Sequence, residues 1–204
     1  IRDRCGGTPA RLFRLSFSGE LAYEIGVPAR FGDGLIRAIM KAGAEHGIAP
    51  YGTEALGVMR IEKGHAAGPE LNGQTTAHDL GLGKMMSKKK DFIGRFMGER
   101  EALNESARAA MVGLKPLDPK MRINAGAHLV PKDADAVAAN DQGYVTSQAY
   151  SPELETFIGL AMLCDGPARY GEVVKVCDPL RNYETLAEVC SPHFVDPEGG
   201  RLRV

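Results

Sequence analysis

Two charged residues occupy positions where a charge is unusual. Glu24 lies in the run of residues 22–27, whose other members are apolar, aromatic or small. A carboxylate in such a run must face water or be held by hydrogen-bond donors, and the pattern favours neither over the other. Arg60 lies between Met59 and Ile61 in a helix-like stretch, where a structural salt bridge is the more common role. Neither residue indicates a function by itself.

The histidines and cysteines are not spaced as metal ligands. The five histidines form no i,i+4 pair and no H-E-x-x-H motif, and the four cysteines form no C-x-x-C pair. A globular chain of 204 residues does not need disulfides, so we expect reduced thiols and a cytoplasmic protein. Residues 81–84, G-L-G-K, lack the G-x-x-x-x-G-K-[ST] pattern of a phosphate loop. The sequence therefore predicts neither a metal site nor a nucleotide site.

The charge balance argues against several classes of partner. With 25 basic and 26 acidic residues the net charge is -1, which creates no general attraction for nucleic acid or anionic lipid. The three lysines at 88–90 are interpreted as a solvated surface. No apolar run approaches 18 residues, and the first residues do not resemble a signal peptide. We therefore expect no nucleic-acid partner and no membrane association.

The first half of the chain combines strands and helices. Alternating side chains predict strands over residues 11–17 and 22–27, joined by a tight turn. Apolar residues at helical spacing predict helices over 31–46 and 53–64. Thr53 is the predicted N-cap of the second helix and Gly47 the predicted C-terminal cap of the first. A shorter helix is expected over 93–103, with Phe92, Phe96 and Leu103 facing inward.

In the second half the apolar residues occur in short runs, a pattern that predicts a β-barrel or sandwich. Short apolar or alternating runs, each bounded by Gly, Pro, Asp or Asn, occur at 109–114, 127–130, 143–149, 157–163, 172–177 and 184–190. We place a domain boundary near residue 105. The overall prediction is an α+β chain with domains 1–104 and 105–204.

Four motifs in a fixed order resemble the glycine-cleavage T-protein (aminomethyltransferase) family. They are R-L-S-F-S-G-E-L-A-Y-E-I from Arg14, G-T-E-A-L-G-V-M-R-I-E-K-G from Gly52, D-L-G-L-G from Asp79 and K-D-F-I-G-R from Lys90. Four ordered motifs are far more specific than any one of them. The variants at 51–56, 59–64 and 88–94, with the closing S-P-H-F-V-D-P-E-G-G-R, are most similar to the C-terminal half of the α subunits of heterotetrameric sarcosine oxidases.

The resemblance implies a fold and a ligand. The fold would be the C-terminal part of a ferredoxin-like folate-binding domain over 1–104, then a small antiparallel β-barrel over 105–204. The ligand would be tetrahydrofolate, with Glu24 accepting hydrogen bonds from the amino group and ring N–H of the pterin. Phe17 stands where many relatives have tyrosine and would pack near the folate. Arg60 would contact the folate or brace its pocket. A solvent-facing Glu24 with no cleft beside it would argue against this assignment.

The resemblance also implies an activity for an intact assembly. Sarcosine would be demethylated oxidatively to glycine, with formation of 5,10-methylenetetrahydrofolate and hydrogen peroxide. FAD, FMN and NAD are expected elsewhere in that complex, which contains other subunits. The family's catalytic aspartate belongs to a region that would precede Ile1, so we assign no catalytic residue within 1–204 and expect no turnover by this chain alone. The motifs fit sarcosine, dimethylglycine and other N-methyl amines equally.

Two alternatives stay open. The first is an aminomethyltransferase that works with a lipoyl carrier protein and without flavin. The second is a non-catalytic folate-binding protein with a K-G-C-Y-x-G-Q-E motif, which is disfavoured because residues 63–70 read K-G-H-A-A-G-P-E and lack its cysteine and tyrosine.

Overall fold

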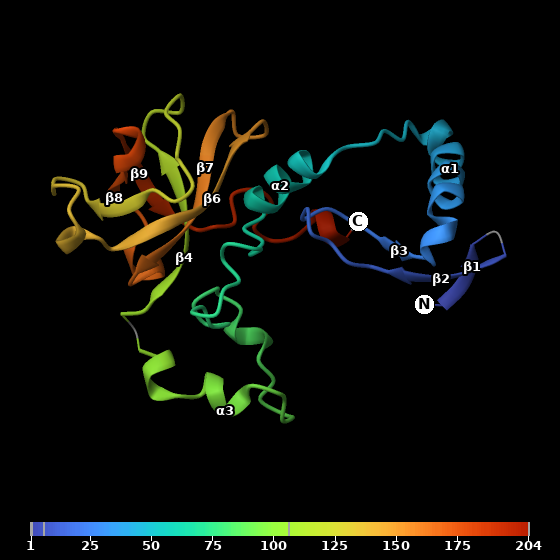
Figure 1. Ribbon diagram of the computed structural model, residues 1–204, viewed down its shortest axis with the longest axis horizontal. Coiled ribbons are helices and arrows are strands. Elements are labelled where there is room, and N and C mark those ends of the chain that lie inside the picture. Colours follow the sequence, from blue (N-terminus) through green and yellow to red (C-terminus); the bar gives the residue numbers. More distant parts are fainter. Residues whose placement is uncertain (1, 6, 106, 204) are drawn as a thin grey trace.

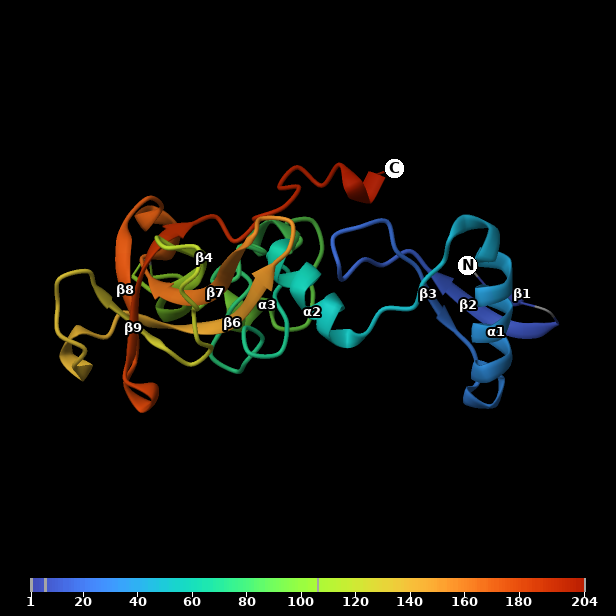
Figure 2. The ribbon, with the colours of Figure 1, turned by 90° about the horizontal axis from the view of Figure 1, so that it is seen from above.

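The computed structural model describes residues 2–5, 7–105 and 107–203, which form a small sheet with a helix at one end and a barrel at the other (Figure 1). The sheet contains β1 (Arg2–Cys5), β2 (Thr8–Phe13) and β3 (Glu24–Gly26), antiparallel and in that order. Helix α1 (Gly32–Gly43) lies over one face of the sheet, and α2 (Thr53–Glu62) lies between the sheet and the barrel (Figures 1 and 2).

The hairpin of β2 and β3 is shorter than predicted and has a longer connection. Its last pair is Phe13 opposite Glu24, so residues 14–23 form a loop instead of a tight turn. The predicted strands over 11–17 and 22–27 are therefore wrong at the ends that face the loop. Serine side chains compete with the strand ladder there, because Ser16 Oγ accepts from the Gly19 backbone N–H at 3.0 Å.

The predicted helices are present but differ at their ends. Helix α1 continues into a 3₁₀ turn, and Gly47 then takes a left-handed conformation with φ 70°, as predicted for a C-terminal cap. Helix α2 has Gly52, not Thr53, at its N-cap position. Within the described ranges, no helix is long and apolar enough to cross a membrane.

Residues 65–105, which follow α2, form an arm with little regular structure. Helix α3 (Arg95–Gly98) has a single turn: Gly94 before it has φ 91°, and the extended backbone of Arg100, with ψ 137°, interrupts the predicted helix over 93–103. Phe96 is 80% exposed, so its predicted inward orientation is wrong. The 3₁₀ turns of the chain are Ala29–Phe31, Ala44–His46, Gly83–Met85, Glu101–Leu103, Ala138–Asn140, Gly166–Arg169, Pro179–Arg181 and Arg201–Arg203.

The second half of the chain is a closed six-stranded antiparallel barrel in the order β4-β7-β6-β5-β8-β9. Its strands are β4 (Ala109–Pro116), β5 (His128–Pro131), β6 (Gly143–Ser151), β7 (Thr156–Cys164), β8 (Val173–Asp178) and β9 (Tyr183–Cys190). Each strand overlaps one predicted run, which confirms the α+β class and the barrel. Leu114, Ile123 and Leu129 are fully buried in its core, and each such side chain contributes roughly 1.5–3 kcal/mol. The division at residue 105 stays a prediction.

Helix α2 packs on the barrel through its apolar face. Ile61 is 4% exposed and belongs to a cluster with Ile158 and Leu160, against which Val58 also packs. This cluster lies outside the central barrel core. The barrel therefore fixes α2, and α2 in turn carries Arg60.

The described cysteines carry free thiols. They are Cys164, Cys177 and Cys190, and burial raises the pKa of Cys190 to about 11, so this thiol is protonated at neutral pH. The side chain of Cys5 lies outside the part of the chain whose side chains are described.

Candidate functional site

Glu24 lies at the start of β3 on the face of the sheet that points away from α1. It is directly opposite Phe13, and directly paired residues of antiparallel strands project to the same face. The other face carries Thr8 toward α1, where Thr8 and Leu35 line a cavity of about 290 Å³. Strand alternation places Phe13 on the opposite side from Thr8.

The Glu24 carboxylate is exposed and faces no protein donor. Within the described residues no hydrogen bond or ion pair reaches it, and it is not among the lining residues of the four cavities described in this structure. None of these four cavities supplies the cleft expected beside Glu24, so the exposed carboxylate argues against a pterin site formed by the described residues alone. On the same face the register places Phe13, which is 44% exposed and directly opposite Glu24, and the exposed Arg11.

Phe17 lies in the loop between β2 and β3 and contacts the segment that follows α2. Its ring meets the His65 ring edge-on, with centroids 4.8 Å apart. Partial burial lowers the pKa of His65, and the positive charge of Arg60 lowers it further, so the neutral imidazole is favoured at pH 7. The contact joins the hairpin loop to the end of α2.

Arg60 is occupied by protein partners. Its Nη1 donates to Glu70 Oε2 at 3.0 Å and to the His65 carbonyl oxygen at 3.4 Å, and its Nη2 donates to Ser147 Oγ at 2.7 Å. The Ser147 hydroxyl donates in turn to Glu70 Oε1 at 2.7 Å. Arg60 therefore braces the loop after α2 against the barrel, and its role at a folate pocket stays a prediction.

Glu70 is the centre of this network and has no exposed surface. Burial alone would raise its pKa, but hydrogen bonds from Ser147 and the Ala67 backbone, with the Arg60 charge, hold the pKa below its usual value. Glu70 is therefore ionised at neutral pH. Removing one partner of such a buried pair leaves an uncompensated charge, so the pair holds these elements together.

A strand irregularity positions Ser147, which donates to Glu70, while the Thr146 hydroxyl donates to the Leu160 carbonyl at 3.0 Å. The β6–β7 register shifts between Val145 and Ser147, so Thr146 is the extra residue of a bulge. Both Thr146 and Ser147 are buried, at 6% and 5% exposed. Sequence reasoning missed Glu70, His65 and Ser147, because no local spacing links a loop glutamate to a strand serine far along the chain.

The structure thus brings together two of the three predicted site residues. Phe17 contacts the His65 ring, and Arg60 donates to the His65 carbonyl oxygen. Glu24 lies apart from them, on the sheet beside Phe13. A separate groove of about 660 Å³ opens between the hairpin loop, α2 and the β6–β7 turn. Its lining consists of Glu20, Gly52, Glu54, Ala55, Val58, Met59, Glu62, Pro152, Glu153 and Arg201. None of the three predicted residues lines this groove.

Comparisons with known proteins agree with the two-part architecture. The model of the GCVT N-terminal domain matches residues 2–90, and that of the glycine cleavage T-protein C-terminal barrel domain matches residues 110–196. The chain is 49% identical over 194 residues to the sarcosine oxidase subunit alpha of Rhizobium meliloti (strain 1021), covering 95% of this chain and 20% of the relative. It is 31% identical over 193 residues to an aminomethyltransferase of Streptomyces avermitilis, covering 92% and 50%.

Comparison with solved structures also finds an aminomethyltransferase. The glycine cleavage system aminomethyltransferase T from Bartonella henselae superposes with a TM-score of 0.71 at 26% identity, covering 91% of this chain and 50% of that one. The chain therefore spans at most half the length of these relatives.

Proposed function

The chain belongs to the glycine-cleavage T-protein family, and we propose that it supplies one wall of a tetrahydrofolate-binding site. The wall is the face of the β1–β3 sheet that carries Glu24 and Phe13. The Phe17 loop lies next to it in the chain, since residues 14–23 connect β2 to β3.

The observation that supports this proposal is the pairing of Phe13 with Glu24. An exposed carboxylate without a protein partner offers both oxygens to a ligand, and the amino group and ring N–H of a pterin are two adjacent donors. The neighbouring Phe13 ring offers an apolar surface to a flat heterocycle. Acceptor and aromatic surface therefore lie side by side on two short strands.

The wall needs a second side, which would explain why Glu24 is exposed here. The relatives are at least twice as long as the matched region. We propose that a part of such a longer protein covers the Glu24 face and encloses the ligand.

Phe17 and Arg60 have different proposed roles. Phe17, 37% exposed, would contribute its ring edge to the ligand site while resting on His65. Arg60 would act indirectly, because its guanidinium is already engaged by Glu70, Ser147 and the His65 carbonyl. It would hold His65, and through it Phe17, in place.

We propose further that the intact protein is a sarcosine oxidase whose folate part this chain forms. Sarcosine, tetrahydrofolate and O₂ would give glycine, 5,10-methylenetetrahydrofolate and H₂O₂, with FAD, FMN and NAD bound elsewhere in the complex. Holding folate next to the reactive iminium favours capture of the one-carbon unit over its loss to water. The 49% identity to a sarcosine oxidase subunit favours this over an aminomethyltransferase, to which the identity is 31%.

The test is calorimetric titration of the intact longer protein that contains this chain with 5-formyltetrahydrofolate, a stable reduced folate. Glu24→Gln keeps the shape but removes one acceptor and the charge, and we expect affinity to fall at least about tenfold, or 1.4 kcal/mol. Glu188→Gln, at an exposed strand position of the barrel, is the matched control and should bind as the wild type does. Equal affinity of Glu24→Gln and wild type, or no binding by the intact wild-type protein at millimolar ligand, would contradict the proposal.

A further inference from the structure

The segment after β9 returns from the barrel across α2 to the hairpin loop (Figure 2). Its backbone is fixed first at the end of α2, where the N–H groups of Phe194 and Val195 both donate to the Glu62 carbonyl, at 2.9 and 3.0 Å. The His193 ring nitrogen Nδ1 lies 2.9 Å from the Lys63 carbonyl oxygen. The segment is therefore bound to α2 before it reaches the loop.

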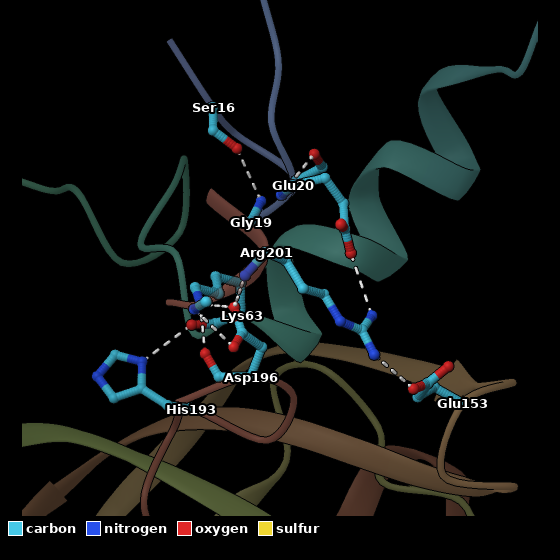
Figure 3. Close-up of polar contacts among 10 residues, drawn as sticks. Ser16, Gly19, Glu20, Lys63, Glu153, His193, Asp196 and Arg201 are labelled. Carbon is cyan, nitrogen blue, oxygen red and sulfur yellow. Dashed lines mark hydrogen bonds and ion pairs between the residues drawn. The ribbon is translucent and has the colours of Figure 1, made fainter. Parts of the chain in front are cut away.

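Asp196 then folds the segment into a compact turn (Figure 3). Its carboxylate accepts from the backbone N–H groups of Gly200 and Arg201, at 2.8 and 3.1 Å, and from Lys63 Nζ at 3.2 Å. Lys63 Nζ also donates to the Asp196 carbonyl at 2.5 Å. Burial alone would raise the pKa of Asp196, but these hydrogen bonds and the Lys63 charge lower it, so the carboxylate stays ionised.

The turn directs Arg201 between two acidic residues from distant elements. Its Nη1 lies 3.1 Å from Glu20 in the hairpin loop, and its Nη2 lies 2.8 Å from Glu153 in the turn between β6 and β7 (Figure 3). The next residue takes part as well, because Arg14 Nη2 donates to the Leu202 carbonyl at 2.7 Å. The C-terminal segment thus holds the loop at Arg14 and at Glu20, on both sides of Phe17.

The loop also lies directly on Lys63. A Cβ added to Gly19 would come within 2.7 Å of Lys63 Cδ, and Gly19 has φ 88°. One lysine therefore supports the loop with its aliphatic stem and the C-terminal turn with its ammonium group. Loop, α2 and C-terminal segment form one junction.

We propose that Arg201 is a positioning residue, which holds the loop of residues 14–20 on the barrel so that Phe17 stays against His65. The junction would thereby set the orientation of the hairpin sheet, including Glu24, relative to the barrel. Its consequence for ligand binding rests on the folate site proposed above. Exposed ion pairs contribute little to global stability, so removing this one should change the loop far more than the fold.

The experiment compares Arg201→Gln with wild type by hydrogen exchange and by thermal unfolding. We expect the amides of Gly19 and Glu20 to exchange about fivefold faster, which corresponds to about 1 kcal/mol, with exchange in β6 and β7 and the Tm nearly unchanged. Arg37→Gln removes another exposed ion pair, Arg37 with Asp33 at 2.9 Å, and should leave the loop as in wild type. Arg201→Lys should restore part of the protection, because a single charge can reach one of the two carboxylates.

Two results would overturn the proposal. One is unchanged loop exchange in Arg201→Gln, and the other is an equal loss of protection in the loop and the barrel. Titration with 5-formyltetrahydrofolate separates this proposal from the preceding one. Weaker binding by Arg201→Gln, with normal binding by Arg37→Gln, supports both. An intact wild-type protein that binds no folate, combined with the local change in exchange, contradicts the folate site alone.

Discussion

Arg60 and Glu70 form an ion pair of 3.0 Å in which Glu70 has no exposed surface and the Arg60 side chain is only 11% exposed. Both residues also form hydrogen bonds with Ser147. Arg60 Nη2 donates to the Ser147 hydroxyl, and this hydroxyl donates to Glu70 Oε1. The pair therefore connects α2, the loop that follows it and strand β6. Its loss would separate three elements at once.

Replacement of Glu70 by alanine should destabilise the chain by about 3–5 kcal/mol, because it leaves the Arg60 charge buried without a partner. Glu70→Gln should cost less, since its amide oxygen can still accept from Ser147. Urea unfolding measures both. Glu188→Ala at an exposed strand position is the control and should change the free energy of unfolding by less than about 0.5 kcal/mol. A Glu70→Ala variant as stable as the control would show that the network contributes no stability.

Stability should decrease as the pH falls, in two separate ranges. The pKa of His65 is lowered from 6.5, so the fold favours the neutral ring and loses stability as the pH falls below 6.5. The pKa of Glu70 is lowered from 4.5, so its contribution is present above 4.5 and is lost as the pH falls further, through its folded pKa.

Urea unfolding at several pH values between 7 and 3 checks this assignment. His65→Gln should flatten the curve below pH 6.5 without changing the more acidic range, and Glu70→Gln should do the reverse. A pH dependence identical in wild type and His65→Gln would mean that another group causes the first decrease.

Gly64 and Gly47 offer a comparison of two glycines with the same backbone angle. Both have φ 70°, but a Cβ at Gly64 would lie 2.4 Å from the Pro192 carbonyl oxygen, whereas a Cβ at Gly47 would meet nothing within 4 Å. Gly47→Ala should therefore cost only the conformational penalty, about 1 kcal/mol. Gly64→Ala should cost clearly more, and should loosen the C-terminal segment, because the Pro192 backbone must move. Similar unfolding free energies for the two variants would contradict this close approach.

The barrel could be predicted from the sequence, whereas the site could be predicted only in part. Each barrel strand has its own alternating or apolar run bounded by turn residues, so local pattern was sufficient. The hairpin ends were wrong because Leu15 and Phe17 continue the alternation of a strand but belong to a loop stabilised by Ser16 and Ser18. The partners of Arg60 could not be predicted, because they depend on a bulge in β6 and on a loop without periodic signal.

The apolar residues of the barrel and of the arm differ in burial. Leu160 is fully buried and lies in the cluster that joins α2 to the barrel, whereas Phe96 in the arm is 80% exposed. Leu160→Ala should destabilise the chain by about 2–5 kcal/mol, and Phe96→Ala should change its stability by less than about 0.5 kcal/mol. Thermal unfolding measures both, and a large loss for Phe96→Ala would mean that the arm packs on the barrel in solution.

Phe13 tests the ligand site separately from the fold. Its ring is 44% exposed beside Glu24, on the sheet face that points away from α1. If this ring contacts the pterin, Phe13→Ala should weaken 5-formyltetrahydrofolate binding by about 0.5–1.5 kcal/mol, the range for a contact between two flat rings, and leave the Tm almost unchanged. Leu12→Ala changes the neighbouring residue on the α1 side and should not affect binding, because strand alternation points its side chain away from Glu24. Equal losses of affinity for the two variants would show that the hairpin as a whole, and not its Glu24 face, determines binding.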